Sequence, residues 1–140
     1  MVTRVYETAT DVKPERLYSA IESVGTWPDW DNELECVCIE GAAIEGASFH
    51  IYPARGPKVT LLVTIAQPPK CFETIATMPL ARLRMRHTFE SDRACGAIIR
   101  IEIETTGPFA WFWDRLIARP LAKGLPETLQ RFAAYSRARP

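Results

Sequence analysis

The chain has 140 residues, 47% of them hydrophobic and 24% charged, a composition typical of one globular domain (1–140) and unlike that of a disordered chain. Seventeen basic residues balance seventeen acidic ones, so the excess positive charge that favours nucleic acid or an anionic membrane is missing. No segment has the apolar length of a signal peptide or a membrane span. We therefore expect a cytoplasmic protein without nucleic-acid binding or stable membrane insertion.

A strand and two short helices are expected first. Residues 3–10 alternate as a strand does, and Asp11 followed by Pro14 favours a helix start. That helix carries a short apolar stripe and is expected to end at Gly25. The segment 26–31, which holds two tryptophans, is predicted to be a compact turn or a second short helix.

Six strand-length segments follow, separated by short turns, which is typical of an antiparallel meander. Turns are indicated by Gly41, by the sequence Arg55-Gly56-Pro57 and by the prolines that follow later strands. The strands are expected at residues 34–40, 47–54, 58–66, 71–77, 80–90 and 97–106.

The segment from Phe109 to Ala138 is predicted to form one long amphipathic helix. Pro120 is expected to bend it, and Pro126 to kink or restart it. Such a helix needs a large apolar partner, which the preceding sheet provides, so the sequence predicts an α+β fold with the helix across a curved sheet. Its apolar stripe has spacings of three and four residues: Phe109, Phe112, Trp113, Leu116, Ile117, Leu121, Leu125, Leu129, Phe132 and Ala133.

Alternation separates an inner from an outer face in the last two strands. Arg82, Arg84 and Arg86 fall on the outer face, where they can pair with glutamates of the next strand. The inner face is almost entirely apolar, and His87 is its exception. The inner set comprises Ala81, Leu83, Met85, His87 and Phe89, followed by Ala97, Ile99, Ile101 and Ile103.

An inward-facing histidine has two interpretations. His87 can be a neutral core residue that bonds to a neighbouring hydroxyl or backbone group. Alternatively, it is the polar group of a ligand cavity, where it fixes an oxygen atom or moves a proton. Burial should lower its pKa in either case. His50 has the opposite parity to Phe49 and Ile51, so we expect it to point outward.

No complete catalytic or metal-binding motif is present. The sequence lacks a nucleophile elbow, a zinc-protease helix motif and a phosphate-binding glycine loop. The four cysteines, Cys36, Cys38, Cys71 and Cys95, form no C-x-x-C and are interpreted as reduced thiols. We therefore expect no metal and no cofactor, and any enzymatic role would depend on His87.

Several segments resemble the polyketide cyclase/dehydrase family of the START and birch-pollen-allergen-like helix-grip superfamily. The resemblance covers nearly the whole chain and implies a seven-stranded antiparallel sheet gripping a carboxy-terminal helix, with an apolar cavity between them. Family members include aromatase/cyclases as well as lipid and hormone carriers. The similar segments are Pro14 to Tyr18, Trp27-Pro28-Asp29-Trp30-Asp31, Gly56-Pro57, Leu83 to Glu90, Thr106-Gly107-Pro108 and Gly124-Leu125-Pro126-Glu127.

Binding of a small hydrophobic molecule, such as a lipid, isoprenoid or aromatic polyketide, is the first hypothesis for function. The alternatives are a polyketide cyclase or dehydratase in which His87 is the general acid or base, and a protein-interaction module without a ligand. A monomer or a homodimer is expected, and Tyr52, Arg55 and Glu73 are candidates for the cavity mouth. Trp30 is expected near the entrance, and the ligand-binding set is Trp30, Ile51, Val63, Phe72, Met85, His87, Phe89, Ile99, Ile101, Phe112, Leu116 and Phe132.

Overall fold

The computed structural model describes residues 1–94 and 96–139 and contains one seven-stranded antiparallel sheet. The strand order is β1-β7-β6-β5-β4-β3-β2, so the strands from β2 to β7 form a meander and β1 joins its far side by pairing with β7. The strands are β1 (Val2–Thr10), β2 (Leu34–Ile39), β3 (Ser48–Pro53), β4 (Val59–Gln67), β5 (Cys71–Met78), β6 (Ala81–Asp92) and β7 (Gly96–Thr106).

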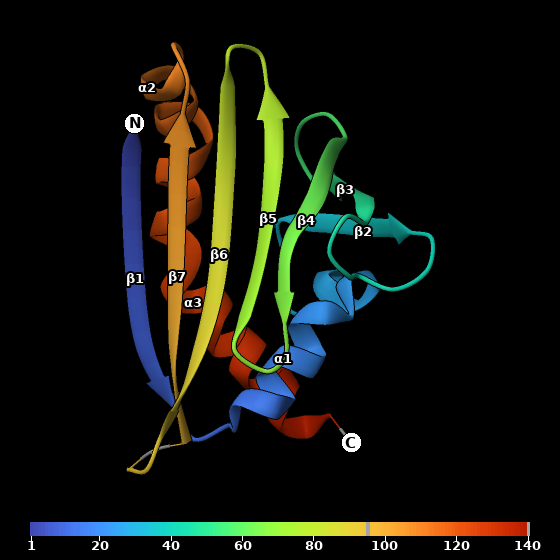
Figure 1. Cartoon of the computed structure of the whole chain (residues 1–140), viewed down its shortest axis with the longest axis vertical. Coiled ribbons are helices and arrows are strands. Elements are labelled where there is room, and N and C mark those ends of the chain that lie inside the picture. The colour runs from blue at the N-terminus through green and yellow to red at the C-terminus, as the bar shows by residue number, and fades with distance from the viewer. Residues whose placement is uncertain (95, 140) are drawn as a thin grey trace.

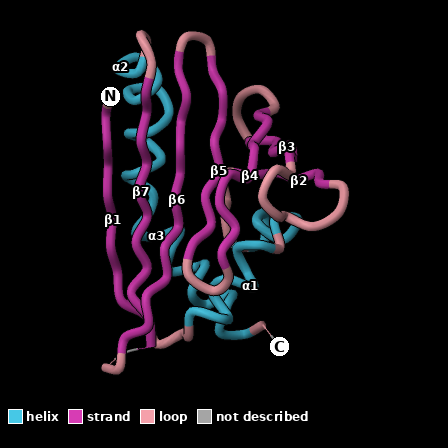
Figure 2. Tube along the Cα trace, viewed as in Figure 1, coloured by secondary structure: helices cyan, strands magenta, loops and turns pink. Residues whose placement is uncertain are grey.

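Helices cover one face of this sheet. Helix α1 (Pro14–Glu22) and the 3-10 helix η1 (Val24–Asp29) connect β1 to β2. After β7 come α2 (Ala110–Trp113), the π-helical turn η2 (Asp114–Ala118) and α3 (Arg119–Ala138). In Figure 1, α2 lies at the end of the molecule that holds the β5–β6 turn, and α1 lies at the opposite end. Figure 2 shows the helical segments on one side of the strands.

The predicted α+β architecture and the expected strands are confirmed. Two details near the first helix are wrong. Lys13, not Asp11, immediately precedes α1, because Pro14 occupies the first helical position and the Asp11 carboxylate instead pairs with Arg137. The helix also ends at Glu22, before Gly25, since the chain tightens into η1 from Val24 onward.

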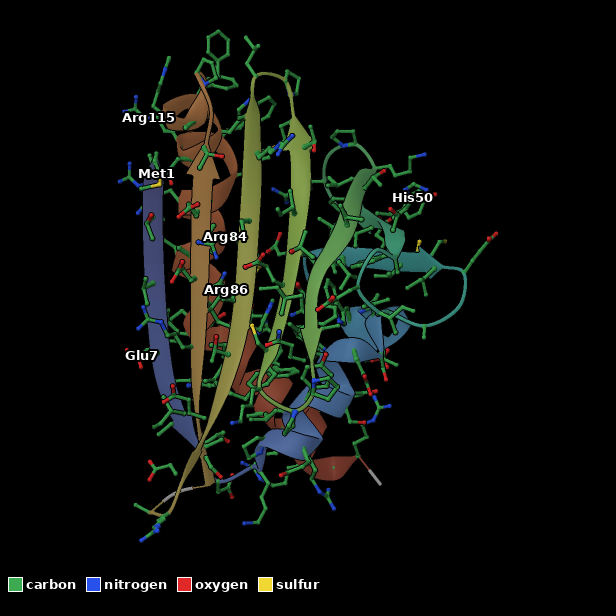
Figure 3. All side chains as sticks on the ribbon, in the orientation of Figure 1. Met1, Glu7, His50, Arg84, Arg86 and Arg115 are labelled. Atoms are coloured by element: carbon green, nitrogen blue, oxygen red, sulfur yellow. The ribbon has the colours of Figure 1, made fainter. Side chains whose placement is uncertain are left out.

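The outer face of the sheet carries a network of arginines and glutamates. The guanidinium of Arg84 forms ion pairs with Glu73 on β5 and with Glu102 and Glu104 on β7, and Nε of Arg86 donates to Glu73 at 2.6 Å. Figure 3 shows Arg84 and Arg86 on the side of the sheet turned away from α3. The predicted cross-strand pairing is therefore confirmed. Glu73 belongs to this face, so the expectation that it reaches a cavity mouth is wrong.

The first half of the long helical segment buries a different face from the one predicted. Phe112 and Leu116 were expected over the sheet, yet they are 41% and 57% exposed. The backbone N–H of Arg119 donates to the carbonyl of Asp114, five residues earlier, so η2 holds one residue more than an α-helical turn. In the first half the buried side chains are instead Ala110, Asp114 and Ala118. In the second half the predicted residues Leu125, Leu129 and Phe132 are buried, together with Ser136.

A buried carboxylate determines which face of the first half of the helix packs against the sheet. Both oxygens of Asp114 accept hydrogen bonds from the Arg4 guanidinium of β1, each at 2.8 Å. These bonds hold the pKa of Asp114 below its usual range. The small side chains of Ala110 and Ala118 flank Asp114 on the same face and let the helix approach the sheet. Helix α3 then continues through Pro126, so the expected restart at that proline is wrong.

Candidate functional site: the inner face around His87

His87 lies in the middle of β6, opposite Phe72 of β5 and Ile101 of β7. The residue is 6% exposed, and its ring centroid lies 6.5 Å from that of Phe72. Burial lowers its pKa from 6.5 to about 4, although a backbone hydrogen bond at Phe72 acts in the opposite direction. The imidazole is therefore neutral near pH 7. Its buried Nδ1 has no hydrogen-bond partner among the described residues.

Two further buried polar atoms on the inner side lack a partner within the described part of the chain. They are Oγ1 of Thr105 on β7 and Nε1 of Trp30, which follows η1. Thr105 pairs across the sheet with Leu83, which lies on the same face of β6 as His87, with Met85 between them. Thr105 could have been predicted to face inward, because it continues the alternate positions of Ile101 and Ile103 along the same strand. Thr105 and His87 thus give the apolar interior two groups that can bond to a ligand oxygen or nitrogen.

Aromatic rings pack the half of the interior nearest α1. The Trp30 and Phe132 centroids are 4.8 Å apart, and Phe89 stacks on Phe132 at 6.1 Å. Trp27 packs edge-on against Phe49 at 5.5 Å, and its Nε1 donates to the carbonyl of Ile21. Trp30 is only 5% exposed, so its expected position near an entrance is wrong. It belongs to this aromatic core because the ring is enclosed by Trp27 and Phe132.

A few apolar residues of the inner side are less enclosed than the rest. Met85 is only half-buried, although Leu83 and His87, its neighbours on the same face of β6, are buried. Ile51 and Val59, on β3 and β4, are also half-buried apolar residues packed against the core. Part of the Met85 side chain is therefore accessible to solvent.

The predicted ligand-binding set consequently divides into three groups. Phe112 and Leu116 are exposed, and Ile51 and Met85 are half-buried. The remaining members are buried: Trp30, Val63, Phe72, His87, Phe89, Ile99, Ile101 and Phe132.

Two surface hollows are present elsewhere. One, of about 360 Å³, lies between residues 22–26 and 39–44, and the other, of about 320 Å³, lies between β1 and α3. Of the predicted set, only Ile99 lines either hollow, and it lines the second. His50 lies on β3, where its Nδ1 is 2.8 Å from the hydroxyl of Thr60.

Metal-binding and thiol chemistry have no assembled site within residues 1–94 and 96–139. No group of three or more histidine, cysteine or acidic side chains there is arranged to hold a metal ion. Cys36, Cys38 and Cys71 are free thiols, and burial raises the pKa of Cys71. The prediction for Cys95 lies outside the described residues. Over the same residues, no helix has both the length and the apolar character needed to cross a bilayer.

No family model matches the sequence, and no curated protein matches it. Solved structures do match in fold. Protein MLL2253 from Mesorhizobium loti has a TM-score of 0.74 at 18% identity, with 99% of this chain and 100% of that chain covered. Ara h 8.0201 has a TM-score of 0.75 at 12% identity, covering 99% of each chain. The di-domain ARO/CYC protein StfQ from the steffimycin biosynthetic pathway has a TM-score of 0.80 at 11% identity, covering 97% of this chain but 50% of StfQ.

These identities show the fold alone. The sheet order, the two short helical segments after β1 and the long final helix are the features that the fold requires. The chain thus has the same helix-grip fold as these solved structures.

Proposed function

We propose that this protein binds a small, largely apolar molecule between the sheet and the helices, at the inner face of β6 around Met85 and His87. The observation that carries the proposal is the buried, unpartnered Nδ1 of the neutral His87 imidazole. Buried polar atoms without a partner are uncommon, because each forfeits hydrogen bonds that it would make in water. A ligand hydroxyl or carbonyl would supply the missing bond.

Apolar contact would supply most of the affinity, at about 25 cal/mol per Å² removed from water. Met85 and Ile51 support this placement because both are half-buried side chains beside the buried core. Thr105 offers a second polar contact on the neighbouring strand. A lipid, an isoprenoid or an aromatic polyketide has the expected chemistry, namely a large apolar body with a few oxygens. StfQ, an ARO/CYC protein of a biosynthetic pathway, shares the fold and supports the last of these classes.

An enzyme that uses His87 as general acid or base, of the cyclase or dehydratase type, is the second candidate. The same unpartnered Nδ1 supports it. However, proton transfer is most efficient when the pKa of the catalytic group lies near the working pH. A pKa of about 4 makes His87 a weak base at neutral pH, which favours a hydrogen-bonding role and hence the binding function.

Native mass spectrometry of the purified protein, combined with titration of cis-parinaric acid, a fluorescent fatty acid, tests the proposal. Met85→Trp should place a bulkier side chain at the proposed site and weaken probe binding about tenfold or more, because an overfilled site displaces its occupant. Leu62→Trp is the matched control, since Leu62 is an exposed residue of β4. Equal probe affinity in wild type, Met85→Trp and Leu62→Trp would place the probe elsewhere and refute the proposed site.

His87→Leu distinguishes the two candidates because leucine occupies a similar volume without a polar atom. A binding protein should lose about three- to tenfold in probe affinity, the usual contribution of one hydrogen bond. An enzyme should instead keep its affinity for substrate and lose turnover. Circular dichroism of the variant separates either result from unfolding.

A further inference from the structure

An exposed apolar surface covers the end of the molecule at α2. Six of the ten large apolar side chains exposed among the described residues lie in this one region. The β5–β6 turn and the start of α2 lie side by side in this region, because the backbone N–H of Phe109 donates to the carbonyl of Leu80. We call it the α2 surface, and it consists of Leu80, Phe109, Trp111, Phe112, Leu116 and Ile117.

The exposure of the α2 surface is a fixed property of the fold. The Nε1 of Trp113 donates to the carbonyl of Pro79 at 2.8 Å, which ties α2 to the β5–β6 turn. On the other side, the two bonds from Arg4 to Asp114 tie η2 to β1. The helix therefore cannot rotate Phe112 and Leu116 toward the sheet without breaking these contacts. Large apolar surfaces that stay exposed commonly mark an interaction site.

Basic side chains border the α2 surface. Arg115, Arg119 and Lys123 are all exposed and recur every four residues, so they follow one flank of the helix. Figure 3 shows Arg115 at the same end of the molecule as Met1. The one carboxylate between residues 107 and 124, Asp114, is buried and bonded to Arg4. The local charge is therefore positive although the whole chain is neutral.

We infer that the α2 surface docks this protein onto an anionic lipid bilayer. Aromatic and aliphatic side chains on one face with cations along its flank are what an interfacial helix presents to headgroups and acyl chains. A second copy of the chain is a poorer occupant. A symmetric contact through this surface would bring the three cations near their own counterparts and cause repulsion. The docking is peripheral and independent of any ligand near His87.

Sedimentation with vesicles tests the inference, using phosphatidylcholine alone and phosphatidylcholine with about one-third phosphatidylglycerol. The wild type should bind the anionic vesicles more tightly, and added salt should weaken this binding. Changing Arg115, Arg119 and Lys123 to glutamine should weaken it by about 100-fold, taking roughly fivefold for each cation. The control with the same charge change is Lys13→Gln, Lys70→Gln and Arg93→Gln, at exposed positions before α1 and in the β4–β5 and β6–β7 turns, at the end opposite α2, and it should change affinity less than about fivefold.

The apolar contribution is tested separately with Trp111→Ser, because Trp111 is 63% exposed and its loss leaves the core intact. Binding should weaken about tenfold while its salt dependence stays the same. Ile44→Ser removes an equally exposed apolar side chain outside the α2 surface and should have no effect.

Tryptophan fluorescence provides a second measurement. Vesicles should shift the emission to shorter wavelength in the wild type and by much less in Trp111→Ser, since Trp27 and Trp30 are already buried and Trp113 is half-buried. Failure of the folded wild type to bind anionic vesicles at low salt would overturn the inference. So would equal losses in the test and control variants. Concentration-dependent dimerisation that Trp111→Ser abolishes, without vesicle binding, would assign the surface to a second copy instead.

Discussion

The buried His87 makes a specific prediction about stability and pH. In the folded protein its pKa is about 4, whereas in the unfolded chain the imidazole should have its ordinary pKa of 6.5. The unfolded state therefore binds more protons between these two values. Stability is complete above pH 6.5, falls as the pH drops toward 4, and loses nothing further from this group below 4.

The magnitude follows from the size of the shift. A change of one pKa unit corresponds to about 1.4 kcal/mol, so the whole window represents about 3 kcal/mol. Between pH 7 and pH 5, the loss from His87 alone is about 2 kcal/mol. This is a large fraction of the roughly 5–15 kcal/mol that stabilises an ordinary domain. The pKa values of Asp114 and Glu102 are lowered by their arginine partners, so these carboxylates titrate at still lower pH.

Urea unfolding at pH 7 and pH 5 measures this loss. From pH 7 to pH 5, the free energy of unfolding of the wild type should fall by about 2 kcal/mol more than that of His87→Leu, which has no imidazole to protonate at this position. His50→Gln is the control, because His50 lies on β3 in contact with Thr60, and it should follow the wild type. An identical pH dependence in the wild type and in His87→Leu would contradict a buried, neutral histidine.

Two further predictions concern the contacts that hold the helix to the sheet. Gly107→Ala should lower the free energy of unfolding by about 2 kcal/mol or more, because Gly107 has a φ of +108° and a Cβ would lie 2.6 Å from the carbonyl oxygen of Leu80. Gly25→Ala, where nothing lies within 4 Å of the added carbon, should stay within about 0.5 kcal/mol, and urea midpoints compare the two. Arg4→Met should cost about 2 kcal/mol by leaving the Asp114 carboxylate buried without its partner, and adding Asp114→Asn should recover part of that loss in thermal unfolding.

The strands were predictable because alternation is a strong signal in a sheet with one apolar face. Leu83, His87 and Phe89 share a parity that Arg84 and Arg86 oppose, and the structure places the two groups on opposite faces. The same rule would have identified Thr105, which continues the inward positions of β7. The local packing of Trp30 was not accessible in this way, since it depends on Phe132, 102 positions later in the sequence.

The extent of the helix was predicted, and so was the buried face of its second half, but the buried face of its first half was not. A stripe of bulky residues at spacings of three and four normally marks the buried face. Here the π-helical turn and the Arg4–Asp114 pair select a face of small residues instead, which leaves Phe112 and Leu116 in solvent. Sequence periodicity assumes a regular helix and cannot detect an added residue in one turn. The spacing of Ala110, Asp114 and Ala118 at four-residue intervals was the feature of the sequence that indicates this buried face.

The sheet ends in two strands that each have a neighbour on one side only, β1 and β2. Such edges expose unpaired backbone groups that can recruit strands from other molecules. β2 has six residues, and its register with β3 shifts between Leu34 and Cys36. β1 carries charged side chains, including Arg4 and Glu7, along its length. Shortness, irregular pairing and charge all oppose aggregation through the edges, so the chain can keep an open sheet around its interior.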